Sequence, residues 1–95
     1  MRLKVAQLGT NKLKSRAVNI NTSPVEIIFD SDVNMAYIQN AGAGNVYIGG
    51  SDVSIANGFK LQAGDRILLT VAKGLSVFVV SDATAEIRIL ELKEV

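Results

Sequence analysis

The residues best placed to do chemistry lie in a glycine-rich stretch at residues 41–53, which reads AGAGNVYIGGSDV. The phosphate-binding pattern GxxxxGK(S/T) fits its glycines and its serine, but Gly50 stands where that pattern requires the lysine that neutralises phosphate. In the dinucleotide-binding pattern GxGxxG the third glycine is replaced by Tyr47, and no helical pattern follows. The stretch therefore predicts a turn, a short strand and a second turn, with glycine supplying the positive φ that sharp bends need. By the same reasoning we assign these glycines to turns: Gly42, Gly44, Gly49, Gly50, Gly58 and Gly64.

Other catalytic or metal-binding patterns are incomplete. The chain has no histidine and no cysteine, so nucleophilic triads built on either residue are impossible. Residues 30–34, DSDVN, are similar to the opening of a calcium-binding loop, but Met35 replaces its glycine and Ala41 its closing glutamate, which leaves an Asx turn as the alternative. We assign no catalytic residue, no cofactor and no metal ligand, and we expect that the protein is not an enzyme.

Charge is distributed unevenly along the 95 residues. Five basic residues precede the first acid, Glu26, and five more share the remaining segment with nine acids, so the two parts carry +5 and −4. Such asymmetry fits a basic arm for nucleic acid, an arm for an acidic protein surface, or solvated charge around a first strand. The opening MRLKVAQLG has no continuous apolar run, so it predicts neither a signal peptide nor a membrane span.

We expect an extended basic arm over residues 1–14 and one β-sandwich or barrel domain over residues 15–95. We predict that the arm and the start of the domain contact the surface of a partner through Arg2, Leu3, Lys4, Val5, Lys12, Lys14 and Arg16.

The hydrophobic pattern predicts an all-β fold. No window keeps apolar residues at helical spacing for a dozen positions, whereas short alternating runs separated by turn residues recur along the chain. Strands are expected at residues 15–21, 25–30, 34–40, 45–48, 59–61, 66–72, 76–80 and 84–92. About eight short antiparallel strands at this spacing predict a small single-domain β-sandwich, jelly roll or barrel.

Several predicted strands are apolar on both faces, although a single small core can cover only one of them. The second face enters either another sheet, through bulges that switch faces, or a subunit interface. We predict that five residues form an oligomer interface: Leu68, Phe78, Val80, Leu90 and Leu92.

Basic and aromatic residues do not coincide. The two tyrosines are Tyr37 and Tyr47, and the phenylalanines lie in apolar strands, so the interleaved pattern of a single-stranded nucleic-acid groove is missing. Nucleic acid is therefore not an expected partner.

The series YIQNAGAGNVYIGGSDVSIANGFKLQAGDRILL, which begins at Tyr37, and the closing AEIRILEL resemble small virion proteins of tailed bacteriophages encoded near capsid genes. The resemblance covers residues 37–90 and implies an all-β protein, often a homotrimer, that decorates or cements the head. It implies the major capsid protein and further copies of the chain as partners, a place on the capsid surface after assembly in the host cytoplasm, and neither a small-molecule substrate nor a membrane.

Two alternatives remain open at this point. Related modules occur in head fibres and tail parts, so the chain is also similar to a fibre or tail module that recognises host glycan. A basic-armed β-barrel that binds nucleic acid is the other alternative.

Overall fold

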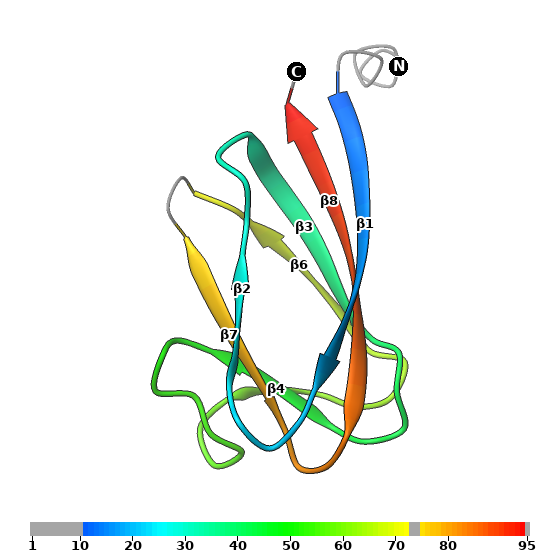
Figure 1. Cartoon of the computed structure of the whole chain (residues 1–95), viewed down its shortest axis with the longest axis vertical. Helices are drawn as coiled ribbons and strands as arrows, with labels where there is room; N and C mark the ends of the chain where they lie inside the picture. Colours follow the sequence, from blue (N-terminus) through cyan, green and yellow to red (C-terminus); the bar gives the residue numbers. More distant parts are fainter. Residues whose placement is uncertain (1–10, 73–74, 95) are drawn as a thin grey trace.

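The computed structural model describes residues 11–72 and 75–94, in which eight strands and no helix are found (Figure 1). The strands are β1 (Asn11–Ile20), β2 (Val25–Ile28), β3 (Val33–Asn40), β4 (Val46–Gly49), β5 (Phe59–Leu61), β6 (Arg66–Thr70), β7 (Ser76–Ser81) and β8 (Ala85–Glu94). The predicted all-β class and the eight antiparallel strands are therefore confirmed. In the same described residues, no helix is long and apolar enough to cross a membrane.

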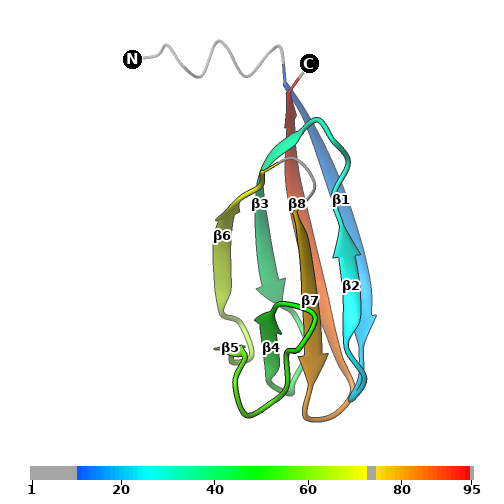
Figure 2. The same cartoon turned by 90° about the vertical axis from the view of Figure 1, so that its left-hand side faces the viewer.

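The strands form two four-stranded antiparallel sheets that face each other (Figure 2). Sheet A has the order β1-β8-β3-β6, and sheet B has the order β2-β7-β4-β5. The pairs β1·β8, β2·β7, β3·β6 and β4·β5 are those of one long antiparallel hairpin rolled into two layers. This order is the jelly-roll form of the β-sandwich.

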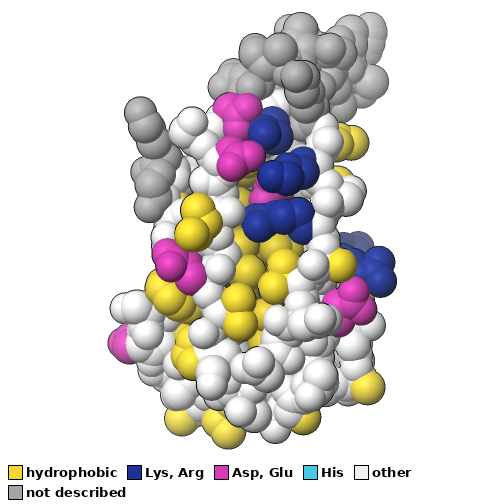
Figure 3. All heavy atoms as spheres, viewed as in Figure 1, with side chains coloured by type: hydrophobic (Ala, Val, Ile, Leu, Met, Phe, Trp, Pro, Cys, Tyr) yellow, Lys and Arg dark blue, Asp and Glu magenta, His cyan; other side chains and the backbone are white. Residues whose placement is uncertain are grey.

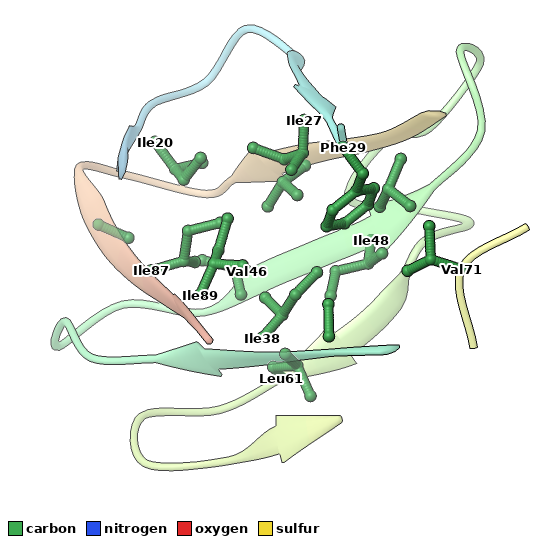
Figure 4. Packing of buried hydrophobic residues seen from close by; sticks show 14 of the residues in the cluster. Ile20, Ile27, Phe29, Ile38, Val46, Ile48, Leu61, Val71, Ile87 and Ile89 are labelled. Atoms are coloured by element: carbon green, nitrogen blue, oxygen red, sulfur yellow. The ribbon is translucent and has the colours of Figure 1, made fainter. Parts of the chain in front are cut away.

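The core lies between the sheets because inward positions alternate with outward ones along each strand. In β8, for example, Ile87 and Ile89 are buried while Arg88 and Leu90 are exposed. Figure 4 shows the apolar side chains of both sheets pointing toward one another. The fully buried members include Ile20, Ile38 and Ile87 from sheet A and Val46 and Val79 from sheet B.

The first strand begins earlier than the sequence predicts. β1 starts at Asn11 and pairs with β8 over ten positions, so the expected boundary between arm and domain at residues 14 and 15 falls inside a strand. Lys14 and Arg16 belong to β1, as does the backbone of Lys12. The charges of Lys14 and Arg16 are accommodated because these side chains pair with the acidic Asp30 and Glu91 at this end of the sandwich. The predicted contact residues Arg2, Leu3, Lys4 and Val5 lie outside the described residues.

Among the described residues, Gly64 alone has a positive φ. The prediction that the other turn glycines are needed for a positive φ is therefore wrong. Gly64 lies in the turn before β6, with φ of 87°. At Gly49 and Gly58, glycine is required because neighbouring side chains leave no room for a Cβ atom. A Cβ at Gly49 would lie 2.9 Å from Val53 Cγ2, and one at Gly58 would lie 2.6 Å from Tyr47 Cβ. These contacts let residues 50–58 pack closely against the outer face of sheet B.

Candidate functional site

The outer face of sheet A presents its side chains in rows that the strand register defines. Leu13, Leu92 and Met35 lie side by side on β1, β8 and β3. The next two rows run across all four strands, in the order β1, β8, β3, β6. The second row is Ser15, Leu90, Tyr37 and Leu68. The third row is Ala17, Arg88, Gln39 and Arg66. The face therefore changes from apolar to cationic along the strands.

The first two rows form an apolar patch, which we define as Leu13, Met35, Tyr37, Leu68, Leu90 and Leu92. Four of its members are exposed, among them Leu13 at 67%, Leu68 at 44% and Tyr37 at 43%, whereas Met35 and Leu92 are half-buried. Together they line a shallow hollow of about 110 Å³. An antiparallel sheet with a solvated face normally carries polar residues at these positions, so contiguous apolar residues indicate a contact surface.

The third row, here called the arginine row, consists of Ala17, Arg88, Gln39 and Arg66. Arg88 Nε donates to Glu86 Oε2 at 3.0 Å, an exposed contact that orients the guanidinium along the sheet. Within the described residues Arg66 makes no ion pair. The arginine row borders a second hollow, which Tyr37 and Leu90 share with the apolar patch. This end of the face is cationic and rich in hydrogen-bond donors.

The structure brings together three of the five residues that the sequence assigns to an oligomer interface. Leu68, Leu90 and Leu92 are in the apolar patch. Phe78 lies in β7 of sheet B and is half-buried. Val80, in the same strand, is 4% exposed, which corrects its assignment to an interface. It faces Val53 of the segment 50–58, with which it lines a hollow on the outer side of sheet B. The chain itself therefore covers Val80.

Sequence reasoning missed the other half of the patch. Leu13 was placed in the arm, and Met35 and Tyr37 were not assigned to any surface. The outward positions of β3 read Met35, Tyr37, Gln39, so their spacing of two was a usable signal. Their place beside Leu90 and Leu92 depends on the pairing of β3 with β8, which no local pattern reveals.

A charged cluster closes the end of the sandwich between β1 and β2. Arg16 Nη2 donates to Glu91 Oε2 at 2.5 Å and to the carbonyl of Ile28 at 3.1 Å, and its guanidinium lies 5.9 Å from the centre of the Phe29 ring. Glu91 is 1% exposed. Among described atoms, Arg16 Nε and Glu91 Oε1 have no hydrogen-bond partner. The ion pair thus ties β1 to β8 and to the carbonyl end of β2.

Lys93, Lys14 and Asp30 form the exposed part of this cluster. Lys93 Nζ lies 3.0 Å and Lys14 Nζ 3.5 Å from Asp30 Oδ2. Figure 3 shows basic side chains gathered in the upper part of this side of the molecule, next to acidic ones. The hydrogen bond from Lys93 and the nearby charge of Lys14 lower the pKa of Asp30 below its ordinary value, and Asp30 in turn raises the pKa of Lys93. Asp32 Oδ1 also lies 3.6 Å from Lys93 Nζ, so the basic side chains of the whole cluster are all paired with acidic ones.

No protein-family model and no curated protein matches this chain. Similar solved structures exist. A cupin-2 domain-containing protein from Shewanella frigidimarina has a TM-score of 0.57 and 18% identity, over 83% of this chain and 69% of that one. The Bacillus endospore appendages, which form disulfide-linked pili, have a TM-score of 0.52 and 18% identity, over 90% of this chain and 89% of theirs. FeII HppE has a TM-score of 0.54 and 9% identity, over 90% of this chain and 45% of its own. At these identities the likeness establishes the fold alone, a small two-layered β-sandwich.

The interior does not offer the ligands that an Fe(II) site needs. Such sites use imidazole and carboxylate groups, and the chain has no histidine. No three Asp or Glu side chains among the described residues are arranged to hold an ion. Each buried polar side chain makes at least one hydrogen bond or ion pair within the described part of the chain. The Asn40 amide donates to the Leu61 carbonyl at 3.0 Å, Ser81 Oγ donates to the Asn45 carbonyl at 2.8 Å, and Glu91 is paired with Arg16.

Proposed function

We propose that the protein is a structural virion protein that decorates or cements a bacteriophage head as a homo-oligomer. The resemblance of residues 37–90 to small phage virion proteins supports this proposal, and three copies is the number that the resemblance implies. The major capsid protein is the proposed partner, and the capsid surface is the proposed location. The protein carries out no reaction in this proposal.

The observation that carries the proposal is the apolar patch on the outer face of sheet A. Fully covering a leucine side chain contributes about 1.5–3 kcal/mol, and the patch holds four leucines together with Met35 and Tyr37. A single domain of this size gains nothing from leaving them in water. A surface built in this way supports permanent association.

Stabilisation of the head follows from mass action. A protein that binds the assembled shell, but not the free capsid subunit, shifts the equilibrium toward the shell by the free energy of its binding. Such a role needs contact surfaces and a stable fold, not a nucleophile or a metal. The absence of histidine and cysteine from the sequence is consistent with it.

The test uses purified virions of the phage whose genome encodes the chain. Quantitative mass spectrometry is expected to find the protein in a fixed ratio to the major capsid protein, and an antibody is expected to label the head. Its absence from virions, or labelling confined to the tail, would contradict the proposal.

A fibre or tail module that binds glycan is the second candidate, and the exposure of Tyr37 favours it. Tyr37 lies beside Gln39 and Arg66 in a hollow that suits a stacked sugar ring with polar contacts. If this function holds, host polysaccharide changes the tyrosine fluorescence at saturating concentration, and Tyr37→Ala abolishes the change. In the decoration role, polysaccharide has no effect.

A further inference from the structure

The outer face of sheet A is polar at one end and apolar at the other, and this asymmetry limits how it can meet a copy of itself. The apolar patch fills the rows that include Leu92 and Leu90, and the arginine row follows at Arg88, each row two residues further along β8. Rows are spaced by about 7 Å along the strands. A contact between two such faces has to cover the patch and keep the guanidinium groups apart.

Two symmetric arrangements bring identical sheet faces together. If the two-fold axis runs along the strands, each row faces the same row of the other copy, and the four guanidinium groups of the two arginine rows face one another across sheets about 10 Å apart.

If the axis runs across the strands, the strands of the two copies are antiparallel, and each row faces a different row of the other copy. With the axis between Leu90 and Leu92, these two leucines oppose each other across the interface, and the two arginine rows are separated by about 20 Å. That distance exceeds the Debye length of about 8 Å.

This inference rests on the proposed self-association, and it names the partner and the geometry. We infer that the outer face of sheet A binds the same face of a second copy, with the strands antiparallel and Leu90 of each copy against Leu92 of the other. In this arrangement the apolar patches cover each other, and each arginine row lies at the rim, where water solvates it.

The size of the face agrees with this partner. Strands β1 and β8 have ten residues each, β3 has eight and β6 has five. At about 3.3 Å per residue and about 4.8 Å between strands, the whole face offers about 500 Å² per copy, or at most about 1,000 Å² for the pair. That is the lower limit for a specific protein interface.

The face-to-face contact is two-fold, so it produces an even number of copies. A ring of three copies needs two different surfaces that meet at an angle, and the apolar patch provides a single flat one. The trimer that the resemblance implies would therefore use another surface of the molecule.

The molar mass in solution tests the inference first. The full chain has a mass of 10.1 kDa and is expected to elute as two copies, or a higher even number, in light scattering at micromolar concentration. Leu90→Glu places two carboxylates in the centre of the contact, and it is expected to yield a single copy with an unchanged β circular dichroism spectrum. Ile28→Glu is the matched control, because Ile28 is 64% exposed on sheet B. A wild-type mass of one or three copies, or a paired Leu90→Glu variant, would overturn the inference.

Cross-linking tests the orientation independently of any destabilising variant. Because the chain has no cysteine, a single introduced thiol reports one position. Ser15 lies on the outer face of sheet A, and in the inferred dimer the backbones of its two copies are about 12 Å apart, about 7 Å along the strands and about 10 Å between the sheets, with their side chains facing each other. A short bismaleimide is therefore expected to join two copies of Ser15→Cys and not of Ser51→Cys, which is in the segment beside sheet B. Equal cross-linking of both variants, or of neither, would contradict the orientation. A single-copy mass together with full binding to heads would overturn this inference and leave the proposed attachment to the head standing.

Discussion

Close packing around Gly58 leaves no space for a side chain. A substitution at this position therefore tests how residues 50–58 pack on sheet B. A Cβ there would lie 2.6 Å from Tyr47 Cβ and 2.8 Å from Val53 Cγ2. We expect Gly58→Ala to lower the free energy of unfolding by about 1–3 kcal/mol, the usual effect of overpacking. Gly50→Ala is the control, since its Cβ would meet only Asp52 Oδ1, at 3.5 Å. Urea denaturation of both variants gives the comparison, and equal stabilities would show that the segment does not pack as described.

The Arg16–Glu91 pair makes Arg16 a more important residue than its half-exposed position suggests. Removing the guanidinium leaves a carboxylate that is 1% exposed without its partner, so Arg16→Met is expected to cost about 3–5 kcal/mol. The double variant Arg16→Met, Glu91→Leu removes both charges and is expected to recover most of that loss. Arg88→Met, which breaks an exposed pair, serves as the control and is expected to change stability by less than about 1 kcal/mol. A double variant as unstable as Arg16→Met would contradict this account of the pair.

Asp30 links stability to pH. Its pKa is lowered from the ordinary 3.8 by Lys93 and Lys14, so the native state binds this proton less tightly than the unfolded state does. The resulting stabilisation is complete above pH 3.8 and is lost as the pH falls through the lowered pKa. The pKa of Lys93 is raised from 10.5, so its contribution is present below that pH and is lost as the pH rises through the raised value. We expect the melting temperature of Asp30→Asn to fall less steeply than that of the wild type below pH 3.8. Parallel curves would show that the contact is too exposed to matter.

At the scale of elements, the eight strands were predictable because each is bounded by turn residues and carries short-range alternation. β5 coincides with the predicted residues 59–61, and β3 differs from its prediction by one residue. The start of β1 was missed because Lys12 and Lys14 look like a solvated arm in the sequence. They belong to a strand because β8 offers ten paired positions and because acids lie near this end of the sandwich.

The candidate site was only half predictable. Leu68, Leu90 and Leu92 were found from apolar residues on the second face of a strand. The burial of Val80 depends on a contact with residues 50–58, and the buried pair of Glu91 depends on the register between β1 and β8. Long-range contacts of this kind are only weakly indicated by the local sequence pattern. Glu91, which follows Ile87 and Ile89 at inward spacing, was the one available clue.

Residues 1–9 precede β1 and lie outside the described residues, so their role is tested by deletion. The eight described strands begin at or after Asn11, and the deletion therefore removes none of these. We predict that the deletion leaves the melting temperature and the number of copies unchanged and weakens attachment to heads, because a basic extended segment can add to a neighbour's sheet edge near acidic side chains. Arg2→Glu with Lys4→Glu is expected to weaken attachment in a salt-dependent way. A drop in melting temperature on deletion would assign the segment to the core of the domain.

At the scale of the whole molecule, the two sheets have different surroundings. Sheet B is partly covered on its outer face by the chain's own residues 50–58, whereas the outer face of sheet A keeps an apolar patch in the open. The apolar patch therefore makes the outer face of sheet A a surface suited to assembly. This difference between the two sheets suits the proposed role, in which sheet A contacts a second copy of the chain and the ends and edges of the sandwich contact the capsid lattice.

The most direct measurement of the central claim adds the purified protein to phage heads that lack it and follows the temperature at which the heads release their DNA. The account predicts saturable binding at a fixed ratio to the major capsid protein and a higher release temperature, and it predicts that Leu90→Glu reduces both effects while Ile28→Glu does not. Heads that bind no protein, or that bind it and release DNA at an unchanged temperature, would contradict the claim that the chain stabilises a capsid.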